Sequence, residues 1–88
     1  MSVIYPLSSL PAGRQAKIVW LSDQKPIAGR LLGLGFEPGA PVSCILRKKN
    51  GRLAAFLIRG AVIALRRDDA DLVFVEETPG PDPAGETP

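Results

Sequence analysis

The side chains that could do chemistry in this 88-residue chain are few, because it contains no histidine. Histidine is the commonest general base and metal ligand, so neither a Cys–His nor a Ser–His–Asp arrangement can be built. The single cysteine, Cys44, alternates with Val42 and Leu46, which predicts a buried thiol in the core and not a nucleophile. A single cysteine cannot form an internal disulfide, and this favours a location in the reducing cytoplasm. We therefore expect that the protein is not an enzyme and that it binds no cofactor.

The only cluster of acids is Asp68, Asp69 and Asp71. Carboxylate oxygens are ligands for a hard cation. Acids this close in sequence more often cap a turn and face solvent. We therefore expect a capped turn here and no metal site.

The basic segment Arg47-Lys48-Lys49-Asn50-Gly51-Arg52 raises the question of nucleic-acid binding. Small barrels bind RNA with basic loops and aromatic platforms. Alternation, however, predicts that Trp20, Phe56 and Phe74 face the core, which leaves few aromatic rings for stacking on bases. A charged hairpin tip also protects strand edges from aggregation. Nucleic acid is thus not the expected partner, and a small basic RNA-binding barrel is kept as the alternative function.

Charge is divided unevenly along the chain. Residues 1–75 hold eleven Lys and Arg against five acids, a net charge of +6, whereas residues 76–88 hold four acids and no base. That second segment also has four prolines, two glycines and no large apolar side chain. We expect one domain over residues 1–75 and a disordered acidic tail over residues 76–88.

Alternating apolar residues predict five short strands, over residues 15–21, 42–47, 53–59, 61–65 and 72–75. Asn50-Gly51 and Gly60 supply tight turns between strands. A helix is predicted over residues 24–34 with Asp23 as its N-cap, and a single helical turn over residues 66–70. Short strands joined by tight turns are typical of a small antiparallel barrel, which the one helix would close at an open end.

The helix and the next strand are separated by two predicted stops. Gly35 is expected to take the left-handed conformation that ends a helix, with Phe36 packing back on Leu31. Pro38-Gly39 fits the central positions of a type II turn, because proline presets φ and glycine tolerates a positive φ.

The helix also shows a candidate binding face. At 100° per residue, Ile27, Leu31 and Leu34 form the predicted core stripe, and Ala28 and Leu32 lie off it. Gly29 and Gly33 stack beside Leu32, although a glycine inside a helix costs about 0.5–1 kcal/mol relative to alanine.

We interpret these glycines as baring the backbone for a partner. The candidate partner-binding segment is Arg30, Leu31, Leu32 and Gly33, with Leu32 as the apolar anchor and Arg30 at the rim. The competing interpretation is that an adjacent loop covers Leu32.

Three segments in this order resemble the FeoA family. They are Leu7-Ser8-Ser9-Leu10 with Gly13, then Arg30-Leu31-Leu32-Gly33-Leu34-Gly35-Phe36-Glu37-Pro38-Gly39, and finally Gly60-Ala61-Val62-Ile63-Ala64-Leu65-Arg66. The resemblance extends over residues 6–75. It departs from the family pattern at Gly29 and Gly33 and in the acidic tail.

The resemblance implies a mostly β, SH3-like small barrel of about five short antiparallel strands with one short helix. It also implies a cytoplasmic, non-enzymatic accessory that binds the cytosolic GTPase part of FeoB, the membrane transporter of ferrous iron. Transition-metal binding is implied for the family, but this sequence offers no ligand set for it. No run of about 18 apolar residues is present, so no membrane insertion is expected. The sequence leaves open whether the protein also forms a weak homo-oligomer.

Overall fold

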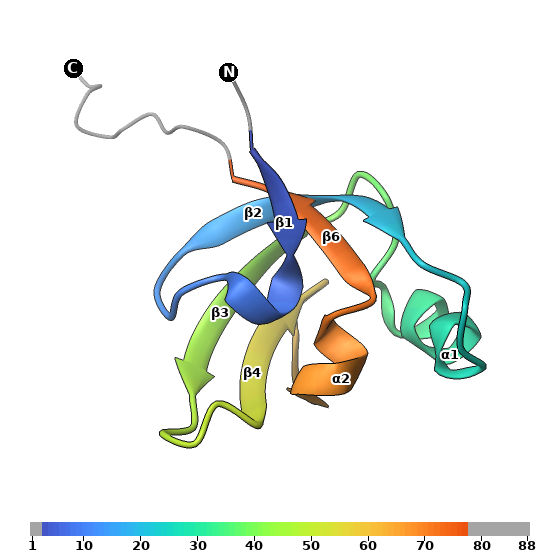
Figure 1. Cartoon of the computed structure of the whole chain (residues 1–88). Coiled ribbons are helices and arrows are strands. Elements are labelled where there is room, and N and C mark those ends of the chain that lie inside the picture. The colour runs from blue at the N-terminus through green and yellow to red at the C-terminus, as the bar shows by residue number, and fades with distance from the viewer. Residues whose placement is uncertain (1–2, 78–88) are drawn as a thin grey trace, which may run out of the picture.

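The computed structural model describes residues 3–77, which form one curved sheet with short helices at its margins (Figure 1). The elements along the chain are β1 Ile4–Pro6, the 3-10 turn η1 Leu7–Ser9, β2 Gln15–Leu21, α1 Ile27–Leu34, β3 Pro41–Arg47, β4 Leu53–Ile58, β5 Ala61–Arg66, α2 Arg67–Ala70 and β6 Val73–Glu76.

The six strands form one sheet in the order β1-β6-β2-β3-β4-β5, and every pair of neighbours is antiparallel. Within residues 3–77 the two edge strands, β1 and β5, do not pair with each other, so the sheet is curved but not closed. β1 begins and β6 ends at the top of Figure 1, whereas the turn between β3 and β4 lies at the bottom.

The predicted strands are all present, with boundaries that differ by at most one residue. β1 was not among them, because three residues are too few to show an alternating pattern, and it exists by pairing with β6. β6 extends to Glu76, the first residue of the predicted tail. Glu77 is also described, and residues 78–88 of that tail lie outside the described residues.

The core fills the concave side of the sheet. Its largest fully buried side chains are Phe36, Phe56, Leu7, Leu10, Ile18, Leu31, Ile58, Val42, Val73, Val75 and Cys44. Cys44 is 1% exposed, which confirms the predicted buried thiol.

Two irregularities in the sheet overturn part of the predicted core. The register shifts between Ile18 and Trp20 and between Cys44 and Leu46, and a bulge moves the following side chain to the other face. Trp20 is 54% exposed as a result, so its prediction as a core residue was wrong. The prediction for Phe74 was also wrong, because Phe74 is half-buried and outside the core cluster. Its ring lies beside Trp20, with the centroids 4.9 Å apart.

Helix α1 begins at Ile27, three residues later than predicted, and Asp23 does not cap it. Pro26 occupies the N-cap position without a capping side chain. The reason is that a proline disfavours helical backbone at the residue before it, here Lys25. The buried side chains of α1 are Ala28 and Leu31, whereas Leu34 is 39% exposed. The predicted core stripe was therefore wrong at Leu34 and at Ala28.

Candidate partner-binding site on helix α1

The outer face of α1 combines bare backbone with exposed apolar side chains. A Cβ built at Gly29 or at Gly33 would meet nothing within 4 Å. Leu32 is 46% exposed and Leu34 is 39% exposed. At 100° per residue the two leucines fall on opposite sides of the glycine strip. Leu32 is about 80° from the centre of the strip and Leu34 about 120° from it on the other side. A partner lying along the strip would therefore approach the helix backbone and contact Leu32.

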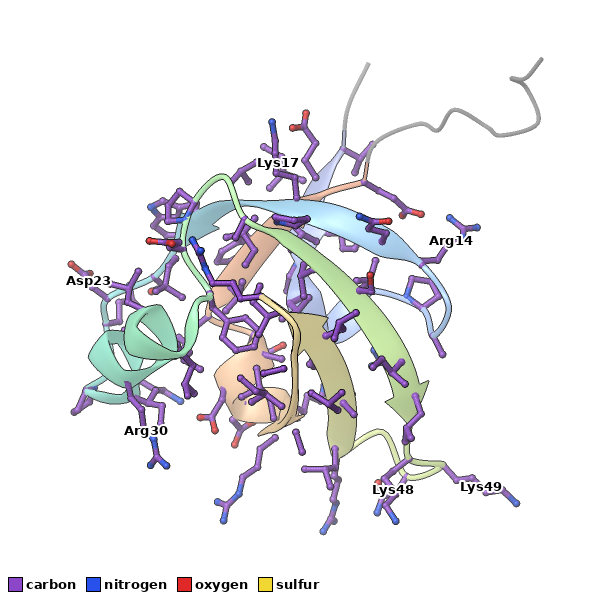
Figure 2. The ribbon with its side chains drawn as sticks, turned by 180° about the vertical axis from the view of Figure 1, so that it is seen from behind. Arg14, Lys17, Asp23, Arg30, Lys48 and Lys49 are labelled. Carbon is purple, nitrogen blue, oxygen red and sulfur yellow. The ribbon has the colours of Figure 1, made fainter. Side chains whose placement is uncertain are left out.

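Arg30 lies next to the glycine strip and projects away from the body of the protein (Figure 2). It is exposed and forms no ion pair with any carboxylate among residues 3–77. The structure thus leaves three of the four predicted binding residues accessible, with Gly33 on the outer face of α1 and Arg30 and Leu32 on its two flanks.

The fourth predicted residue, Leu31, cannot contact a partner. It is 1% exposed and belongs to the hydrophobic core cluster, so its inclusion in the binding segment was wrong. Leu31 is instead the main side chain that holds α1 on the sheet. The exposure of Leu34 was not predicted, because its spacing placed it in the core stripe with Leu31. In the structure α1 packs on the sheet through Ala28 and Leu31, which leaves Leu34 exposed.

The end of α1 is fixed by the backbone, as predicted. Gly35 is left-handed with φ 111°. Its N–H donates to Leu32 O at 3.0 Å, and the N–H of Phe36 donates to Leu31 O at 3.0 Å. These two bonds form a Schellman motif. Phe36 is fully buried, so the helix end is held in place and its outer face is presented on a rigid support.

The second predicted stop is also confirmed. Gly39 has φ 93°, and the N–H of Ala40 donates to Glu37 O at 3.1 Å, as in a type II turn. The N–H of Gly39 donates to Ile18 O at 2.7 Å, which ties this turn to β2. The segment from Gly35 to Gly39 therefore links α1 to the sheet with little freedom.

One cation of the predicted basic segment has a structural role. The guanidinium of Arg47 donates to the carbonyl oxygens of Leu10, at 2.8 Å, and Ser8. These bonds hold η1 and the segment after it against β3. Arg47 is therefore not available to a nucleic acid, in contrast to Lys48 and Lys49, which project from the turn (Figure 2).

The acidic cluster lies in and just after the short helix α2, whose N-cap position is Arg66 without a capping side chain, so the predicted capped turn was wrong. The three carboxylates do not converge on one point. Asp68 and Asp69 lie in the first turn of α2, where negative charge is favoured by the helix dipole. Asp71 accepts a hydrogen bond from the Ser8 hydroxyl. Among residues 3–77, no three His, Cys, Asp or Glu side chains gather as a metal site would require.

A partly exposed cluster joins β1 to the residue after β6 and the residue before β2. The Tyr5 hydroxyl and the Arg14 guanidinium both donate to the Glu77 carboxylate. Burial, reinforced by the bond to Glu77, raises the pKa of Tyr5 from 10.0 to about 12. The bonds from Tyr5 and Arg14 lower the pKa of Glu77. This arrangement makes the phenol a weaker acid, and its bond to Glu77 connects β1 to the end of β6.

Within residues 3–77, no helix combines the length and the apolar character needed to cross a membrane.

Comparison with known proteins agrees with this fold. The chain is similar to a FeoA-like protein from Clostridium acetobutylicum, with 18% identity, a TM-score of 0.80, and coverage of 88% of this chain and 90% of that one. It is also similar to FeoA of Stenotrophomonas maltophilia, described as a procaryotic SH3 domain protein in complex with zinc. That match has 29% identity, a TM-score of 0.72, and coverage of 85% of this chain and 88% of that one.

A manganese-dependent transcriptional repressor shares the fold, at 15% identity and a TM-score of 0.79, over 89% of this chain and 44% of the repressor. No curated protein sequence matches the chain significantly. The sequence profile of the FeoA domain matches residues 5–77. Because this match spans most of the chain, the protein belongs to the FeoA family, whose members are non-enzymatic accessories of ferrous iron transport.

Proposed function

We propose that this protein binds the cytosolic part of a FeoB-type iron transporter through the outer face of α1. The observation that carries the proposal is the exposure of Leu32 beside the open strip of Gly29 and Gly33. An apolar anchor on a rigid support, with a cation at its rim, is the arrangement of an interaction hot spot. Arg30 would supply that cation.

Binding at this face would act on the transporter by changing the balance between its conformations. A ligand shifts such a balance only when it binds one conformation more tightly than another. A rigid helix face suits this role, because little conformational entropy is lost when it docks. The protein would need no catalytic group of its own.

The test is capture of the purified cytosolic part of the transporter by the full chain. Leu32→Glu should keep the melting temperature and abolish capture, because it places a charge in the apolar centre of the contact. Val62→Glu is the matched control: Val62 is 63% exposed on β5, and the same substitution there should leave capture unchanged.

Two results would contradict the proposal. If Leu32→Glu binds as well as the wild type, the contact lies elsewhere. If Val62→Glu alone abolishes capture, the partner docks on the outer face of the sheet and not on α1.

RNA binding by the basic hairpin tip is separated from this proposal by its salt dependence. The remaining cations of that segment, Lys48, Lys49 and Arg52, would bind phosphates, and such binding falls steeply between low and physiological salt. An apolar contact at Leu32 should change far less.

A further inference from the structure

A recess lies at the opposite end of the molecule from the start of β1, between the β3–β4 turn and the junction of β5 with α2. It is a concavity of about 690 Å³, lined by Asn50, Arg52, Leu53, Arg66, Arg67 and Asp68. Three of its six lining residues are arginines.

Backbone pairing holds these arginines in place. The N–H of Arg67 donates to Arg52 O at 2.9 Å, which joins the start of α2 to the hairpin. Arg66 is the cross-strand partner of Leu53. The Asn50 side chain accepts a hydrogen bond from Arg52 N–H at 2.8 Å, which leaves its NH₂ group to donate. The donors of the recess are thus placed by paired strands and a bonded turn.

The three guanidinium groups lack compensating charge. None of them forms an ion pair with a carboxylate among residues 3–77, where the two ion pairs belong to Arg14 and Arg59. Asp68 is the single acid of the lining. Lys48 and Lys49 add positive charge at the same end (Figure 2). Like charges gathered in a recess repel one another, and a bound anion relieves that repulsion.

We propose that this recess binds a small polyphosphate, such as a nucleoside diphosphate or triphosphate, through its phosphate groups. The planar fork of arginine matches phosphate oxygens with two parallel hydrogen bonds. The volume lies within the roughly 300–1,000 Å³ of small-molecule sites. No aromatic side chain lines the recess, so the phosphates and not a base are recognised.

The experiment is calorimetric titration of the full chain with pyrophosphate and with ATP at low salt. The double variant Arg52→Gln, Arg66→Gln should weaken binding at least tenfold. Lys17→Gln, Lys25→Gln removes the same charge from exposed positions outside the recess and should change the affinity less than threefold. Asp68→Asn should tighten binding, because it removes the only negative charge of the lining.

Three results would overturn the proposal. The first is the absence of saturable binding to both pyrophosphate and ATP. The second is an equal loss of affinity in both double variants, because that would indicate diffuse attraction to a basic surface. The third is binding to vesicles of phosphatidylglycerol with none to the soluble probes, which would make this end a membrane contact. If the arginine variant does not fold, the change in affinity of Asp68→Asn decides the question.

Discussion

The side chain of Arg59 lies across the backbone of Gly35, so close that a Cβ built on Gly35 would be 2.9 Å from Arg59 Cδ. Arg59 comes from the turn between β4 and β5 and also forms an ion pair with Glu37. The end of α1 is therefore enclosed by its own cap and by a distant turn. Any side chain at position 35 would meet both a left-handed backbone, with φ 111°, and this neighbour.

Gly35→Ala should destabilise the protein by about 1–3 kcal/mol, the cost of holding a residue other than glycine in the left-handed region plus a displaced neighbour. Chemical denaturation of the wild type and the variant measures this difference. Arg59→Ala in the Gly35→Ala background should recover part of the loss, because it removes the contact. An unchanged loss would mean that backbone strain alone causes it.

Gly33→Ala is expected to have the opposite effect on stability. Gly33 has ordinary helical backbone and open space at its Cβ position, so alanine should stabilise the fold by about 0.5–1 kcal/mol. The same variant should weaken capture of the transporter, because a methyl group blocks close approach to the helix. Higher stability with unchanged capture would show that the glycine strip is not part of the contact.

Leu31 and Leu32 are adjacent but should respond very differently to truncation. Leu31→Ala should cost about 2–5 kcal/mol, because Leu31 is 1% exposed in the core. Leu32→Ala should stay within about 0.5 kcal/mol of the wild type, as do most surface substitutions. Both values come from denaturant midpoints. Similar losses in the two variants would mean that Leu32 is packed in the protein and not free to bind.

The Tyr5–Glu77 pair should make stability fall at both ends of the pH range. The pKa of Tyr5 is raised to about 12, so its contribution is complete below pH 10 and is lost as pH rises toward 12. The pKa of Glu77 is lowered in the fold, so its contribution is complete above its ordinary value of 4.5 and is lost as pH falls below it.

Tyr5 is the only tyrosine in the chain, so its ultraviolet absorbance can be titrated directly. Ionisation near pH 10 in the folded protein would contradict the described contact with Glu77. Tyr5→Phe is the control for stability, because it should remove the part of the alkaline loss that belongs to this phenol.

Trp20 should be accessible to solvent in the native state. It is 54% exposed and lies against Phe74 on the outer face of the sheet. Since it is the only tryptophan, iodide should quench the fluorescence of the folded protein nearly as well as that of the unfolded chain. Protection from iodide would place Trp20 in the core, as the alternating pattern alone predicts.

The sequence determined the elements whose signals are local. Gly35 and Pro38-Gly39 each dictate a turn by backbone sterics alone, and both turns were predicted correctly. The strands after Asn50-Gly51 and Gly60 also follow from nearby residues. The exposure of Leu32 was predicted from its angular position on α1, and three residues of the candidate site were therefore identified before the fold was known.

Tertiary structure decided the properties that depend on contacts between distant segments. β1 exists because β6 lies beside it, and three residues carry no periodic signal of their own. The exposure of Trp20 follows from a register shift between β2 and β6, which no pattern within β2 records. The gathering of Arg52, Arg66 and Arg67 around one recess likewise results from pairing between separate strands. Local sterics are written in neighbouring residues, whereas register and packing are set only when the whole sheet forms.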